Sequence, residues 1–172
     1  GEAYIPQEEG WSNAIWFPYF RDGEVINRKY RDGKKNFCME AGAERILYGL
    51  DDIDTTAIIV EGEMDKLSLD ECGFTSTVSV PDGAPSVTAK DYTSKFVFLE
   101  ADMEKLQTVQ HWILAVDGDE PGRKLEDELA RRLGREKCLR VRWPQDCKDA
   151  NETLVKYGKE IVAGCIQRAE PF

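Results

Sequence analysis

The chain is predicted to fold as an α/β protein: a compact, mostly parallel sheet flanked by helices, with a small N-terminal antiparallel lobe that is rich in basic residues. From residue 56 onward, short apolar runs alternate with helix-length segments, which is typical of a parallel sheet. Before that point, two aspartate–glycine turns separate strand-like runs, which indicates antiparallel hairpins. We therefore expect one lobe over residues 1–54 and a second domain over residues 55–170.

The N-terminal lobe is expected to be a small meander. Residues 1–13 show no regular pattern and predict a loose lead-in. Two runs rich in aromatic and β-branched residues, 14–20 and 25–30, flank an aspartate–glycine pair at 22–23, and a second such pair follows at 32–33. These turns predict strands that pair in chain order.

The second domain is expected to alternate strands and helices. Proline at position 121 and glycine at 134 bracket one helix, as their preferences for the first helical position and the position after the end predict. The predicted strands are residues 57–60, 77–80, 112–116 and 139–143. The predicted helices are residues 65–72, 96–110, 121–133, 151–157 and 159–167.

The charge of the chain limits how it can bind nucleic acid. The net charge of −10 over 172 residues argues against binding by bulk electrostatic attraction alone. Residues 21–37, however, carry six basic residues against three acidic ones. This asymmetry predicts a basic surface beside an acidic site.

The patterns of cysteine, histidine and hydropathy argue against several classes of protein. The five cysteines are odd in number and form no C-x-x-C pair, so we expect a reducing compartment, no structural disulfides and no zinc site. The only histidine, His111, precedes a predicted strand, which argues against a hydrolase triad. No apolar run reaches the length of a membrane span and no signal peptide is visible, so no membrane association is expected.

Acidic residues gather in three places: at 61–65, at 117–119 and at 148–152. The first two clusters directly follow apolar runs that read as buried parallel strands, and sites of open α/β sheets lie at such strand ends. Converging carboxylates repel one another unless a cation joins them, and their hard oxygens suit Mg²⁺ or Mn²⁺. The sequence therefore predicts a metal site that serves phosphate chemistry.

Each cluster also has a purely structural interpretation. Asp65 would lie at the start of a helix, where acids are common because they cap the helix or interact with its dipole. Asp119 precedes Pro121 and is placed to cap a helix. The matching positions of the clusters after two strands favour the metal site over capping alone.

The motifs resemble those of a known family. Glu61-Gly62-Glu63-x-Asp65 after one strand and Asp117-x-Asp119-x-x-Gly122 after a later one resemble the TOPRIM domain of primases, topoisomerases and certain nucleases. The K-D-A-N-E segment at 148–152 is similar to the phage-type primase-helicases and their organellar relative Twinkle. Residues 47–52 and 168–171 resemble most closely the plant organellar branch.

The resemblance implies roles for particular residues. Glu61 matches the family glutamate that serves as general base or acid and lies beside the metal. Asp117, Asp119 and Asp149 match aspartates that bind Mg²⁺ (or Mn²⁺). Four basic residues of the lobe are expected to face the template and the nucleotide: Lys29, Arg31, Lys34 and Lys35.

The implied activity is Mg²⁺-dependent nucleotidyl transfer, in which nucleoside triphosphates are joined into an RNA primer on single-stranded DNA. A replicative helicase is the implied partner, and a mitochondrion or plastid the implied location. Two features of that branch are missing from these residues: the cysteine pairs of the zinc domain and the G-x-x-x-x-G-K-[ST] loop of the helicase motor.

Two other functions are compatible with the residues. The same acids could activate water in a phosphodiester-cleaving enzyme, although Tyr92 and Tyr157 lack the context of a topoisomerase nucleophile. Alternatively, the domain is a non-catalytic module in which aromatic residues stack on single-stranded bases. The aromatic residues considered for stacking are Tyr19, Phe20, Tyr30 and Phe37.

Overall fold

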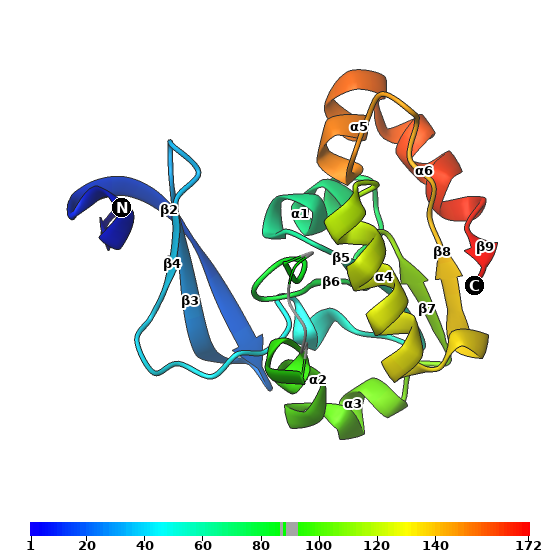
Figure 1. The fold of residues 1–172 in the computed structure, drawn as a ribbon, viewed down its shortest axis with the longest axis horizontal. Coiled ribbons are helices and arrows are strands. Elements are labelled where there is room, and N and C mark those ends of the chain that lie inside the picture. Colours follow the sequence, from blue (N-terminus) through cyan, green and yellow to red (C-terminus); the bar gives the residue numbers. More distant parts are fainter. Residues whose placement is uncertain (87, 89–92) are drawn as a thin grey trace.

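The computed structural model describes residues 1–86, 88 and 93–172, so that Tyr92 lies outside the described residues. Two sheets lie side by side along the molecule (Figure 1). The first is a four-stranded antiparallel sheet of the N-terminal residues, and the second is a five-stranded, mostly parallel sheet flanked by helices. The predicted α/β class with an antiparallel N-terminal lobe is confirmed.

The N-terminal sheet has the strand order β1-β2-β3-β4, with β1 Glu2–Ile5, β2 Gly10–Arg21, β3 Glu24–Asp32 and β4 Phe37–Met39. The predicted hairpin at 22–23 is present, and both turn residues have positive φ, 52° and 78°, as turns that match strand twist require. The N-terminal sheet thus follows chain order.

The prediction of a loose lead-in over residues 1–13 was wrong. Strand β1 pairs with the beginning of β2, and Ala3 and Ile5 are buried against Ala14. The turn between them is a short 3₁₀-helix, Pro6–Glu8, closed by Glu9 in a left-handed conformation with φ 51°. Nothing in this turn resembles an aspartate–glycine signal, which is why the hairpin was missed.

The second sheet has the order β6-β5-β7-β8-β9, and its first four strands are parallel. These strands are β5 Thr56–Val60, β6 Thr77–Ser79, β7 His111–Leu114 and β8 Cys138–Arg140. Each overlaps a predicted strand. The short edge strand β9, Glu170–Pro171, is antiparallel to β8.

Helices cover both faces of this sheet (Figure 1). On one face, α2 Val97–Ala101, α3 Met103–Gln107 and α4 Glu120–Leu133 share a core with Trp112. On the other face, α1 Glu63–Glu71, α5 Ala150–Tyr157 and α6 Lys159–Gln167 pack on Ile58 and Val60. Three further 3₁₀-helices are Leu50–Asp52, Thr93–Phe96 and Arg135–Lys137.

The single helix predicted over residues 96–110 is instead two short helices. The break lies at Asp102, whose Oδ1 accepts a hydrogen bond of 2.7 Å from Arg21 Nε of β2. A tertiary contact therefore competes with helical continuity at this position. No helix among the described residues is long and apolar enough to cross a membrane, and the five cysteines are all free thiols.

The two sheets share one hydrophobic core. Phe17 and Tyr19 of β2 are buried together with Leu47, Leu50 and Val78, which belong to the connecting segment and to β6. This shared packing holds the basic side chains of the N-terminal sheet in place beside the ends of the parallel strands.

Candidate metal centre

The ends of three neighbouring parallel strands define the site. Strand β7 lies between β5 and β8, with Ile113 opposite both Ile58 and Leu139. Because parallel strands in one register end at the same edge, the residues that follow them meet there. Glu61 follows β5 and Asp117 follows β7, as the sequence predicted.

Three buried aspartates come together at this edge: Asp65, Asp117 and Asp149. One carboxylate oxygen of each lies within 4.8 Å of the others. Asp65 comes from the first turn of α1, and Asp149 is the N-cap of α5. Three convergent carboxylates supply the hard oxygen ligands that Mg²⁺ and Mn²⁺ prefer.

Asp65 was not predicted as a ligand. The acidic pattern at 61–65 contained it, but a first-turn aspartate is also what the helix dipole favours, so the two interpretations could not be separated. In the structure its Oδ1 accepts a hydrogen bond of 3.1 Å from Asn151 N at the start of α5. This contact between α1 and α5 turns the Asp65 side chain toward Asp149.

The other two aspartates are also held by specific donors. Asp149 Oδ1 accepts from Glu152 N at 2.7 Å, which caps α5. Asp117 Oδ2 accepts from Lys148 Nζ at 2.8 Å. Asp65 and Asp149 are therefore oriented by backbone N–H groups, as a preorganised metal site needs, whereas Asp117 is held by a side-chain cation.

Burial and mutual repulsion perturb these carboxylates. The pKa of Asp65 is raised, mainly because burial disfavours its charge and secondly because Asp149 is close. Burial also raises the pKa of Asp117, although Lys148 opposes the shift. A bound divalent cation would relieve both effects, so the donor set fits such an ion.

Glu61 lies at the end of β5 beside the aspartates. Its Oε1 accepts a hydrogen bond of 3.0 Å from Ala84 N, whereas its buried Oε2 has no hydrogen-bond partner among the described residues. Burial, followed by the charge of Asp117, raises the pKa of Glu61 to about 7. A buried oxygen without a partner is a further reason why a cation fits here.

Asp119 lies outside the buried triad. Its side chain is exposed, and its Oδ1 accepts from Gly122 N at 2.9 Å as the N-cap of α4. The capping role that the sequence allowed is therefore present. The motif requires a glycine at position 122, because a Cβ there would lie 2.1 Å from the Asp117 carbonyl oxygen.

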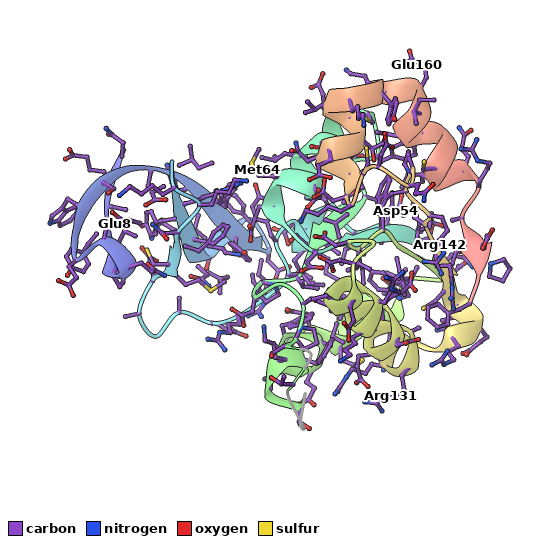
Figure 2. The ribbon with its side chains drawn as sticks, turned by 45° about the horizontal axis from the view of Figure 1, so that its top comes forward. Glu8, Asp54, Met64, Arg131, Arg142 and Glu160 are labelled. Carbon is purple, nitrogen blue, oxygen red and sulfur yellow. The ribbon has the colours of Figure 1, made fainter. Side chains whose placement is uncertain are left out.

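A cleft of about 830 Å³ extends from the aspartates to the N-terminal sheet. Lys29, Arg31 and Lys35 line it together with Phe37, whereas Lys34 does not and instead pairs with Glu8. Figure 2 shows Met64 at the side of α1 that faces the N-terminal sheet, and Glu8 at the far end of that sheet. Three of the four predicted basic residues thus face the acidic site.

The aromatic residues considered for base stacking are placed differently from one another. Phe37 lines the cleft, and the cations of Lys29 and Arg31 lie 5.0 and 5.5 Å from its ring centroid. Tyr19 is buried in the shared core. Tyr157, considered above as a nucleophile, is the last residue of α5, at the opposite end of that helix from the Asp149 cap, and it donates its hydroxyl hydrogen to Asp146.

Comparison with known proteins identifies the family. The family model described as the Toprim domain matches residues 55–142, just over half of the chain. The chain belongs to the Toprim family. Its Toprim region begins one residue before β5 and includes Glu61, Asp65 and Asp117, while Asp149 lies beyond the matched residues.

Two curated relatives from Arabidopsis thaliana are each 44% identical over 92% of this Toprim chain: the chloroplastic/mitochondrial Twinkle homolog protein and the primase homolog protein. The chain spans 24% of the length of the first and 51% of the second. It is therefore similar to one part of each of these longer proteins.

Solved structures show the same fold. A chain from the structure of the bacteriophage T7 lagging-strand DNA polymerase with primase domains, an RNA/DNA hybrid and dTTP matches with a TM-score of 0.75 and 25% identity, covering 92% of this chain and 79% of that one. The primase fragment of the T7 primase-helicase matches with a TM-score of 0.72 and 26% identity, covering 91% and 65%. This Toprim chain has a primase-like fold.

Proposed function

We propose that the chain is the catalytic domain of a primase, which joins nucleoside triphosphates into RNA on a single-stranded DNA template. The observation that carries this proposal is the cleft with buried aspartates at one end and basic side chains at the other. A metal bound by the acids suits triphosphates, and the basic side chains suit a nucleic-acid backbone. The kinship with a primase homolog and the fold of the T7 primase fragment support it.

Asp65, Asp117 and Asp149 would hold Mg²⁺ or Mn²⁺, which when bound neutralises phosphate charge. Asp119 keeps an exposed carboxylate oxygen free of its capping bond, and we propose that it approaches the metal site from the solvent side. Glu61 would accept the proton of an attacking 3′-hydroxyl, because its buried oxygen points to no other partner among the described residues.

The basic residues of the cleft would orient the substrates. Arg31 and Lys35 would contact the phosphates of template and nucleotide, and Phe37 offers a ring for one base. Lys29 has a different role, because its ammonium is already bound by Glu63 and by the Pro81 carbonyl oxygen. It would fix the sheet rather than bind substrate. Lys34 would be a peripheral phosphate contact.

Because the chain spans only part of its relatives, the assay should not require template recognition. An RNA primer annealed to a longer DNA template and supplied with four nucleoside triphosphates and Mg²⁺ tests bond formation directly. Extension by the wild type, with loss in Asp117→Asn, would support the proposal. If the RNA primer carries a label, its shortening would favour a cleavage enzyme. Binding of the primer–template without Mg²⁺, and with no extension or cleavage, would favour a non-catalytic module.

We also propose a replicative helicase as partner and a mitochondrial or plastid location, as the chloroplastic/mitochondrial relative suggests. Imaging of the fluorescently tagged full-length protein tests the location. Co-purification of that protein with the organellar replicative helicase tests the partner, and helicase recovery no higher than with an unrelated tagged organellar protein would contradict it.

A further inference from the structure

The side chain of Lys148 lies among the aspartates. Its Nζ is 2.8 Å from Asp117 Oδ2 and 3.5 Å from Asp149 Oδ2. The ammonium therefore pairs with two of the three carboxylates that would bind the metal. An Mg²⁺ ion would bind these same carboxylates, with Mg–O distances of about 2.1 Å. The two cations would then lie close together and repel each other, so that binding of one weakens binding of the other.

The backbone of Lys148 is fixed while its side chain is not enclosed. The Lys148 carbonyl oxygen accepts from Gly118 N at 2.7 Å, and its N–H donates to Glu152 Oε2 at 2.9 Å. The side chain is 51% exposed and lines the cleft. The ammonium can thus leave the aspartates by side-chain rotation while the Lys148 backbone stays in place at the edge of the cleft.

We propose that Lys148 is a resident counter-ion that competes with the divalent metal for Asp117 and Asp149, and that its displaced ammonium binds the phosphates of the incoming nucleotide. The second half rests on the proposed function; the first half does not. When ionised, the three aspartates carry a charge of about −3, which the lysine reduces to about −2, so the ammonium lowers their attraction for a divalent ion. A triphosphate then brings new negative charge, and the freed ammonium is positioned to pair with it.

The first test is an Mg²⁺ titration by calorimetry on the wild type, Lys148→Met and Arg45→Met. Arg45 lines the same cleft and pairs with Asp82 at 3.3 Å, so its removal deletes one positive charge without touching the triad. We expect Lys148→Met to bind Mg²⁺ about tenfold more tightly, and Arg45→Met to stay near the wild type. Equal or weaker binding by Lys148→Met would overturn the competition.

The second test uses a nucleoside triphosphate with an α,β-methylene bridge, which binds but cannot transfer its nucleotidyl group. At saturating Mg²⁺, Lys148→Met should bind this probe about tenfold more weakly, while Lys148→Arg should retain most of the affinity. Unchanged binding would overturn the phosphate role alone. Neither test requires primer extension, so an inactive wild type would contradict the proposed function and leave the competition standing.

A third measurement needs no substitution, which protects the inference if a variant folds poorly. The side-chain ¹⁵Nζ resonance of Lys148 in the wild type should shift during the Mg²⁺ titration, at the same metal concentration as the Asp117 backbone amide. A Lys148 signal that stays constant while the Asp117 signal moves would show that metal and ammonium do not exclude each other.

Discussion

Lys29 Nζ lies 2.8 Å from Glu63 Oε1, and this contact joins the N-terminal sheet to the first turn of α1, two residues before Asp65. Tyr19 Oη donates to the same Glu63 oxygen at 2.5 Å. The Lys29 and Glu63 side chains are 11% and 4% exposed. One buried acid therefore links the basic surface to the first turn of α1, in addition to the hydrophobic packing that the two sheets share.

Lys29→Met should destabilise the protein by about 3 kcal/mol, because it leaves the buried Glu63 carboxylate without its cation. Denaturant unfolding measures this change. Lys34→Met is the matched control, since its partner Glu8 is reached at the exposed edge of the same sheet, and no measurable loss is expected there. An equal loss of unfolding free energy in both variants would show that the buried Lys29–Glu63 pair stabilises the protein no more than an exposed pair does.

Asp117→Asn should abolish Mg²⁺ binding in the millimolar range, because it removes a charged ligand from the buried triad. Asp119→Asn should weaken binding by only a few-fold, since that side chain is exposed and already caps α4. Calorimetry with each variant at the same pH gives the comparison. A larger effect from Asp119 would place the metal on the solvent side of the triad.

Asp149 both caps α5 and faces the metal site, and two substitutions separate the roles. Asparagine caps a helix about as well as aspartate, so Asp149→Asn should keep its stability and lose metal affinity. Asp149→Ala should lose both, with a stability cost of about 1 kcal/mol from the cap. Thermal unfolding in EDTA measures the contribution of the cap to stability, and a metal titration measures the contribution of the carboxylate to metal affinity.

Stability in EDTA should fall as the pH rises from about 4.5 to about 7 because of Glu61. Its pKa is raised to about 7 by burial, so the folded state retains a proton that the unfolded state has released. The retained proton therefore adds to the free energy of unfolding. This contribution is complete below 4.5, the ordinary pKa of a glutamate, and it is lost as the pH rises past about 7. Glu61→Gln should remove about 3 kcal/mol of this dependence.

Urea unfolding of the wild type and Glu61→Gln at pH 5 and pH 8 checks the sign. Asp65 and Asp117, whose pKa values are also raised, remain in the variant and preserve their own part of the slope. If both proteins changed equally with pH, Glu61 would be ionised in the folded state throughout this range.

Gly122→Ala should displace Asp117, because the added Cβ would lie 2.1 Å from the Asp117 carbonyl oxygen. Overpacking of this kind costs about 1–3 kcal/mol or more. Metal affinity should fall with it, since the ligand would move. Gly118→Ala serves as control: its Cβ would be 3.6 Å from the nearest atom, the Lys148 carbonyl oxygen, which is ordinary contact.

The parallel sheet and its acidic edge could be predicted because their signals are local. The run at 57–60 is continuously apolar and buried, and the acid that follows it must lie at the strand end. The same holds for Asp117 after β7. Chain order and strand direction then suffice to bring these residues together.

The remaining features depend on contacts between distant residues. Lys29 is a basic residue on a strand, and only the fold brings Glu63 to it, 34 residues away. The break at Asp102 depends on Arg21 of another sheet. Asp65 could not be told from a dipole-stabilising aspartate until α5 was placed beside α1.

The cap formed by Asp149 has a consequence for judging which relatives are active. A protein that had lost catalysis would still need a side chain that accepts the Glu152 N–H, so selection for folding alone would retain aspartate, asparagine or serine there. An aspartate at this position of a homologue is therefore weak evidence that the homologue is an active enzyme. Asp117 is the more informative position, because it follows strand β7 and its side chain accepts from the Lys148 ammonium rather than from a backbone N–H at a helix end.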